Sequence, residues 1–138
     1  NNSMNSSEHI LLNSKLRPTA MRILIFSFLR KHRQALTITD IESKFQKVSR
    51  STVLRTIKTF ERKGLIHAIS DDSKYLKYAL NDPNQPEHQN HLHLNCLSCN
   101  HTYCMYNYTL PQISIPPRYH VKTTQILVKG ICDICQIK

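Results

Sequence analysis

The sequence predicts an α+β fold in two parts, a helical N-terminal half that ends in a β-hairpin and a small antiparallel C-terminal half. Three segments with helical periodicity precede two short strand-like segments. Two C-x₂-C pairs enclose the last third of the chain. The charge is uneven, because thirteen of the 19 Lys and Arg lie between positions 15 and 63, against three of the nine acidic residues.

The first two predicted helices have clear start signals. Thr19 is the expected N-cap of a helix that continues to about Lys31 on an apolar stripe of i, i+3, i+4, i+7 spacing. Thr37 and Asp40 have the spacing of a capping box, which predicts a second helix over the following residues.

The third predicted helix begins near Ser49 or Ser51 and ends at Gly64, a residue suited to the C′ position. Its apolar residues share one face. The opposite face carries hydroxyl and basic side chains, at Ser51, Arg55, Lys58 and Arg62. A helix of this kind can lie in the major groove of DNA, although the same pattern also fits a merely solvated helix.

Two short strands, at 65–69 and 75–80, flank a turn at 71–73 and predict a β-hairpin. Three helices followed by a hairpin is the order of a winged helix-turn-helix. Together with the basic charge of the same region, this order predicts DNA binding.

The C-terminal half follows a polar segment with two prolines. We expect a first domain at 1–82, a linker at 83–90 and a second domain at 91–138. Strands are expected before Cys96, at 101–106 and at 124–129, and prolines exclude a long helix over 110–117.

The two C-x₂-C pairs predict a closed tetrahedral zinc site with four sulfur ligands. The ligands are Cys96, Cys99, Cys132 and Cys135. Two disulfides or a thioredoxin-type redox pair are the alternatives. The polar opening of the chain indicates no secretory signal, so we expect a reducing compartment and favour zinc.

Composition narrows the function. A net charge of +10 indicates a polyanionic partner, which charge alone leaves open between DNA, RNA and an anionic membrane. No apolar run has the length of a membrane span, and we expect no membrane partner. We also expect no enzyme, because the four-cysteine site is closed and the H-x-E motif of zinc deaminases is missing.

Four segments resemble the ferric uptake regulator (Fur) superfamily, at 16–22, 49–66, 91–99 and 127–135. The resemblance covers nearly the whole chain. It implies a cytoplasmic, homodimeric, metal-dependent transcriptional regulator with a winged-helix domain, a C-terminal dimerisation domain and structural zinc on the C-x₂-C pairs.

The resemblance also implies which residues contact double-stranded operator DNA, namely Arg17, Ser51, Thr52, Arg55 and Lys58. We expect Arg17 and Lys58 on phosphates, and Arg55 on a base edge or a phosphate. Leu54 stands where the family usually has a tyrosine, so the operator sequence is expected to differ from the usual one.

A second, regulatory metal site is expected between the domains. His91 and His93 point the same way on a strand just before Cys96, as in the family motif. By position, the resemblance adds His67 and Cys104, while Ala35 and Ala79 stand where other members have ligands. The expected set is His67, His91, His93 and Cys104, with His88 as a substitute.

Three imidazoles and one thiolate favour Zn²⁺ over Fe²⁺ or Mn²⁺. We therefore expect a zinc-responsive regulator of the zinc uptake type, most simply a repressor. The alternatives are an iron or peroxide sensor that uses Fe²⁺ or Mn²⁺, and a metal-independent DNA-binding protein with only the structural zinc.

Overall fold

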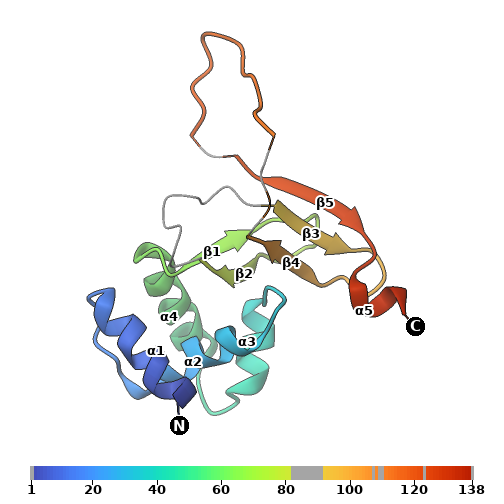
Figure 1. Cartoon of the computed structure of the whole chain (residues 1–138). Helices are drawn as coiled ribbons and strands as arrows, with labels where there is room; N and C mark the ends of the chain where they lie inside the picture. Colours follow the sequence, from blue (N-terminus) through green and yellow to red (C-terminus); the bar gives the residue numbers. More distant parts are fainter. Residues whose placement is uncertain (1, 82–91, 107, 109–110, 123, 138) are drawn as a thin grey trace.

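A computed structural model describes residues 2–81, 92–106, 108, 111–122 and 124–137 (Figure 1). The predicted linker at 83–90 and the ligand candidates His88 and His91 lie outside these residues. In chain order the described elements are α1 (Asn2–Asn13), α2 (Ala20–Lys31), α3 (Ile38–Lys44), α4 (Arg50–Arg62), β1 (Ile66–Ile69), β2 (Lys77–Leu80), β3 (Leu92–Cys96), β4 (Thr102–Met105), β5 (Ile126–Gly130) and α5 (Asp133–Gln136).

The three predicted helices are confirmed as α2, α3 and α4. The Thr19 side chain accepts a hydrogen bond from the N–H of Arg22, and Thr37 and Asp40 form the capping box on α3. Ser49 caps α4 and so fixes the start that the sequence left between two serines. Each cap satisfies backbone N–H groups that have no partner within the helix.

The core of the N-terminal half is formed where α2, α3 and α4 meet. Ile25, Ile41, Val53 and Ile57 are fully buried there. The Phe60 ring meets Phe26 edge to face, with ring centroids 5.4 Å apart. The polar face of α4 remains outside this core, which leaves it available to a partner.

Helix α1 was not predicted, because its sequence is rich in Asn and Ser and has no clear apolar stripe. Leu11 is nevertheless fully buried against the core, and Ser7 accepts a buried hydrogen bond of 2.7 Å from the Ser27 hydroxyl on α2. The N-terminal half therefore has four helices before the hairpin.

The hairpin is confirmed as an antiparallel pair, with His67 opposite Ala79 and Ile69 opposite Lys77. Gly64 precedes it with a φ of +74°, a left-handed conformation in which glycine carries no steric cost. This hairpin is the wing of the winged helix-turn-helix.

The C-terminal sheet has the strand order β4-β3-β5. β3 and β4 are antiparallel as expected, but β3 and β5 are parallel, so the prediction of an all-antiparallel sheet was wrong. β4 provides the return that a parallel pair needs. Met105 at the end of β4 and Ile126 at the start of β5 both pair with Leu92, so the connection from β4 to β5 links two strand ends at the same end of the sheet.

Within that connection, residues 111–122 are all exposed and form no helix, in line with the prolines of this region. Figure 1 shows them as an excursion away from the sheet. Several carry apolar side chains, including Ile113 and Tyr119, which are 54% and 74% exposed.

The two halves meet where the wing and the segment between α2 and α3 reach the C-terminal sheet (Figure 1). The Ala35 N–H donates to the Thr102 carbonyl over 2.7 Å, and Gln34 and Tyr103 form a β-bridge. Arg33 lies over the Tyr103 ring and pairs with Asp133. None of the helices formed by the described residues has the length and apolarity needed to traverse a bilayer.

Candidate metal centres

The first centre gathers all four cysteines of the C-x₂-C pairs. Cys96 ends β3 and Cys99 follows in a turn, while Cys132 precedes α5 and Cys135 lies within it. Their sulfur atoms all lie within 4.8 Å of one another, and all five cysteines of the chain are free thiols. The disulfide alternative therefore has no support in the structure.

The spacing of these sulfurs fits zinc. Sulfurs at about 2.3 Å from one Zn²⁺ in a tetrahedral arrangement are about 3.8 Å apart. The Sγ atoms of Cys99 and Cys132 lie 3.9 Å apart. The four thiolates would close the coordination sphere, so this centre suits a structural role.

Backbone N–H groups prepare the sulfurs for a cation. The N–H groups of Cys99 and Cys132 point at the Cys96 sulfur from 3.5 Å and 3.3 Å, and they lower the pKa of Cys96 to about 6. The backbone N–H of Cys135 lowers the pKa of Cys132 in the same way. Thiolates are the form that binds metal, so the local backbone favours the ligand state of Cys96 and Cys132. At Cys135 the contact with Ser98 lowers the pKa, but the Cys132 sulfur, burial and the other sulfurs outweigh it and raise the pKa to about 11, so this thiol must release its proton to become a ligand.

The second centre consists of His67 from the wing strand β1, His93 from β3 and Cys104 from β4, with ligand atoms within 4.8 Å of one another. The Nε2 atom of His67 lies 3.3 Å from Nε2 of His93 and 3.5 Å from Sγ of Cys104. His93 and Cys104 face each other across the β3–β4 pair. The centre therefore joins the wing to the C-terminal sheet.

Burial governs the protonation of these side chains. It lowers the pKa of His67, and together with the nearby His67 it lowers the pKa of His93 to about 4. Both rings are thus neutral at pH 7 and have a nitrogen lone pair for a metal. Burial raises the pKa of Cys104 to about 12, so this thiol must release its proton to become a ligand.

Asn81 was missed in the sequence, yet it orients a ligand. Its Oδ1 lies 2.6 Å from Nδ1 of His67, while its Nδ2 donates to the Gly64 carbonyl over 2.6 Å. His67 Nδ1 is therefore the protonated nitrogen, and Nε2 faces the other ligands. The only signal in the sequence was that a polar residue directly follows the wing.

The two alanines at usual family ligand positions lie close to the same region. Ala35 bonds to Thr102 at the contact between the halves, and Ala79 is directly opposite His67. Neither can bind a metal. Among the described residues, no carboxylate belongs to the second centre.

The predicted DNA contacts lie on the surface of the N-terminal half. Ser51, Arg55 and Lys58 are exposed on α4, Thr52 is half-buried beside the Ser49 cap, and Arg17 is exposed before α2. Leu54 is 40% exposed on the same helix. Their contacts with DNA stay predictions.

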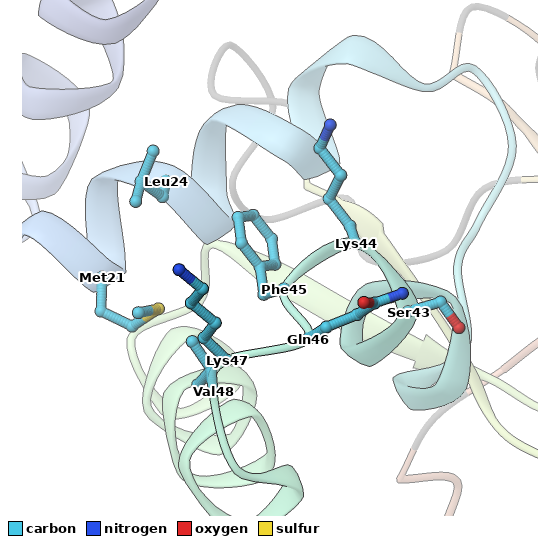
Figure 2. A pocket seen from close by; sticks show the side chains of 8 residues that line it. All are labelled: Met21, Leu24, Ser43, Lys44, Phe45, Gln46, Lys47 and Val48. Carbon is cyan, nitrogen blue, oxygen red and sulfur yellow. The ribbon is translucent and has the colours of Figure 1, made fainter.

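A surface pocket of about 480 Å³ lies between α2 and the turn that leads into α4. Met21, Leu24, Phe45 and Val48 give it an apolar floor. Figure 2 shows the ammonium groups of Lys44 and Lys47 on either side of Phe45. These lysines add positive charge next to the N-terminal end of α4.

A winged helix-turn-helix half with a basic outer helix is combined here with one cluster of metal-ligating side chains in the C-terminal half and another between the halves. This combination defines the class of metal-binding winged-helix proteins. The sequence model of the Ferric uptake regulator family matches residues 13–126. The chain belongs to this family, whose members are metal-responsive transcriptional regulators.

Individual relatives agree with this assignment. A ferric uptake regulation protein of Synechococcus elongatus is 31% identical over 93 residues, which cover 64% of this chain and 60% of that protein. The chain thus matches less than two thirds of the length of this curated relative.

Solved structures share the fold. A zinc uptake regulator complexed with zinc and DNA has a TM-score of 0.64 at 14% identity, over 97% of this chain and 93% of that chain. The Helicobacter pylori ferric uptake regulator, whose structure reveals three functional metal-binding sites, has a TM-score of 0.58 at 15% identity, over 98% and 92%. At these identities the similarity is one of fold.

Proposed function

We propose that this chain is a cytoplasmic transcriptional regulator that binds operator DNA as a homodimer and acts as a repressor when Zn²⁺ occupies the second centre. The observation that carries this proposal is the convergence of His67, His93 and Cys104, from three strands, on one point between the wing and the C-terminal sheet. His91 is proposed as a fourth ligand from outside the described residues.

The choice of zinc follows from the donor atoms. Two imidazole nitrogens and one sulfur fit Zn²⁺, whereas Fe²⁺ and Mn²⁺ sites depend more on carboxylates and on higher coordination numbers. The bonds from Zn²⁺ to its ligands would be stronger than the ordinary side-chain contacts between the halves.

The position of the ligands provides the link to DNA. His67 moves with the wing, and His93 and Cys104 move with the C-terminal sheet. Ligation of all three favours the arrangement in which the halves are close, so metal raises the population of that arrangement. In a dimer, the same arrangement sets the spacing of the two α4 helices.

Exposed apolar residues of the C-terminal half support the homodimer. Tyr108, Val128 and Ile134 are 65%, 41% and 47% exposed, in addition to those at 111–122. Apolar exposure of this extent is typical of a surface covered by a partner.

Two other functions remain candidates. The Synechococcus relative is a ferric uptake regulation protein, which favours iron sensing. Alanines at positions 35 and 79, together with backbone bonds that already join the halves, favour metal-independent DNA binding with structural zinc alone.

A binding experiment distinguishes these functions. Duplex DNA is first selected from a random pool by the zinc-loaded protein. The affinity of the protein for this DNA is then measured by fluorescence anisotropy, once with zinc present and once with a chelator present. We expect zinc to raise the affinity by about tenfold or more, a usual size for coupling between two sites. Fe²⁺ under anaerobic conditions is titrated in parallel.

His93→Ala should lose the zinc dependence and retain the zinc of the cysteine centre. His120→Ala is the matched control, because His120 is an exposed histidine of the same half. Equal affinity of wild type with zinc and with chelator would refute zinc sensing, and a response to Fe²⁺ alone would select the iron sensor.

A further inference from the structure

A buried ion pair lies where the wing meets the C-terminal half. The Nζ atom of Lys77 on β2 lies 2.7 Å from Oδ2 of Asp71, in the loop between β1 and β2. The side chains are 7% and 0% exposed. Such a burial of two charges is unusual and needs partners for the remaining polar atoms.

The C-terminal half supplies those partners. Lys77 Nζ donates to the Asn100 carbonyl over 2.5 Å and to the Thr102 hydroxyl over 3.3 Å. The Thr102 hydroxyl donates in turn to Asp71 Oδ2, and Asn95 Nδ2 lies 3.4 Å from the same oxygen. Ser73 of the wing loop also donates to Oδ1 of Asp71. Both charges therefore come from the wing, and the further groups that satisfy Lys77 and Oδ2 of Asp71 come from β3, β4 and the turn between them.

The cysteine centre fixes the position of one of these partners. Asn100 directly follows Cys99 and has a φ of 63°. Its N–H donates to the Cys96 carbonyl over 2.8 Å. The carbonyl that receives Lys77 is thus held by the same turn that presents Cys96 and Cys99.

The energetics indicate what this network contributes. A buried ion pair adds little net stability relative to apolar side chains of the same size, but an arrangement that leaves either charge without partners is costly. The observed docking of the wing on the sheet gives both charges partners from the C-terminal half. The network therefore specifies the orientation of the wing more than it stabilises the fold.

The network and the second metal centre contact different points of the wing. Lys77 is opposite Ile69 in the hairpin, whereas His67 is opposite Ala79, closer to the end of α4. The wing thus has one attachment built on a buried ion pair and another that depends on a metal ion, besides exposed contacts such as that of Asp72 with Lys129.

We propose that Asp71 and Lys77 are positioning residues that hold the wing in one orientation on the C-terminal half whether or not the second centre contains a metal. The role of the second centre in this inference rests on the proposed function. Ligation at His67, His93 and Cys104 adds the other attachment, so metal release frees the wing only to pivot about the ion pair.

The Ala35 amide provides a direct measure of this docking. Its N–H donates to Thr102, across the contact between the halves, whereas the neighbouring Leu36 N–H donates to Tyr78 within the N-terminal half. Amide hydrogen exchange is measured by NMR on the full chain with one zinc ion per chain. The variant is Asp71→Leu with Lys77→Met, which removes both charges and keeps similar volumes.

We expect exchange at Ala35 to accelerate about tenfold or more in this double variant, with exchange at Leu36 and zinc content unchanged. The matched control is Asp72→Asn with Lys129→Met, because these residues form an exposed ion pair between the wing loop and β5, and asparagine tolerates the φ of 70° at position 72. In this control, the rate of amide exchange at Ala35 should equal that of the wild type.

Unchanged exchange at Ala35 would overturn the proposal. Equal acceleration at Ala35 and Leu36 would also overturn it, because that result means global destabilisation and not a loss of docking. The measurement needs neither DNA nor metal at the second centre. A wild type whose DNA binding ignores zinc would refute the proposed function and leave this result standing.

Discussion

Arg55 is the clearest single residue on which DNA recognition can be tested. It is exposed in the middle of α4, and its guanidinium lies 3.4 Å from the Thr52 hydroxyl on the same helix. Its side chain is therefore outside the core, and its removal leaves the packing of α4 intact.

Arg55→Ala should weaken binding of the selected DNA by about 1–3 kcal/mol, the usual size of a lost base or phosphate contact. Zinc content and the unfolding midpoint should not change. A salt titration by anisotropy measures the effect, with Lys122→Ala as the control, since Lys122 is exposed on the C-terminal half. Equal salt curves for Arg55→Ala and wild type would exclude α4 as the reader.

For the residues of the two metal centres, the spacing of the motifs predicted the ligands better than the side chains that orient them. Spacing alone predicted four ligands, and the structure brings these four sulfurs together. The orientation of His67 by Asn81 could not be predicted, because the two residues are adjacent only after the wing has folded.

Among the elements, we expect the turn from Cys96 to Cys99 and the short helix α5 to depend most on a metal at the cysteine centre. Buried residues of this half form a small cluster of Cys96, Tyr103 and Cys132, and α5 itself buries none. A core of this size cannot hold a separate subdomain without a further constraint.

Cys96→Ser should therefore lose the structural zinc and the order of β5 and α5, and with them the dimer. The N-terminal helices should remain, because their core is independent of the cysteines. Metal analysis and mass measurement in solution test this. Cys104→Ser is the matched control and should keep both zinc and dimer; an unchanged metal content in Cys96→Ser would contradict the assignment.

Elements with strong local signals were predictable, and those without were not. The helices α2 to α4 have caps and apolar periodicity in the sequence, so they were found. Helix α1 depends on burial of Leu11 and on the bond between Ser7 and Ser27, which are contacts with another helix. The parallel pairing of β3 and β5 depends on which edge of the β3–β4 pair receives β5, which periodicity does not encode.

For the whole molecule, the buried Asp71–Lys77 ion pair, at the contact between the halves, predicts a pH dependence of stability. Burial raises the pKa of Asp71, but hydrogen bonds from Lys77, Ser73 and Thr102 outweigh it and hold that pKa well below its ordinary value of 3.8. The carboxylate therefore stabilises the folded state fully above that ordinary value, and this contribution is lost as the pH falls below it.

Urea unfolding from pH 5.5 to pH 3 tests this on the protein with zinc in the cysteine centre, with the zinc content measured at every pH. The wild type should lose stability with a steeper slope than the Asp71→Leu, Lys77→Met double variant, which has no such carboxylate. The exposed-pair control, Asp72→Asn with Lys129→Met, should follow the wild type. Equal slopes of unfolding free energy against pH for all three proteins would show that protonation of Asp71 is not coupled to folding.

The sequence by itself determined the three principal helices, the wing and the two C-x₂-C pairs, because caps, periodicity and short spacings act between near neighbours. The tertiary structure decided which residues from distant strands meet. His67 and Cys104 are 37 positions apart, and Asp71 and Thr102 are 31 apart, yet each pair lies in contact. The physical reason is that such contacts arise from the docking of the wing on the C-terminal sheet, a step in which burial and charge satisfaction outweigh local preference.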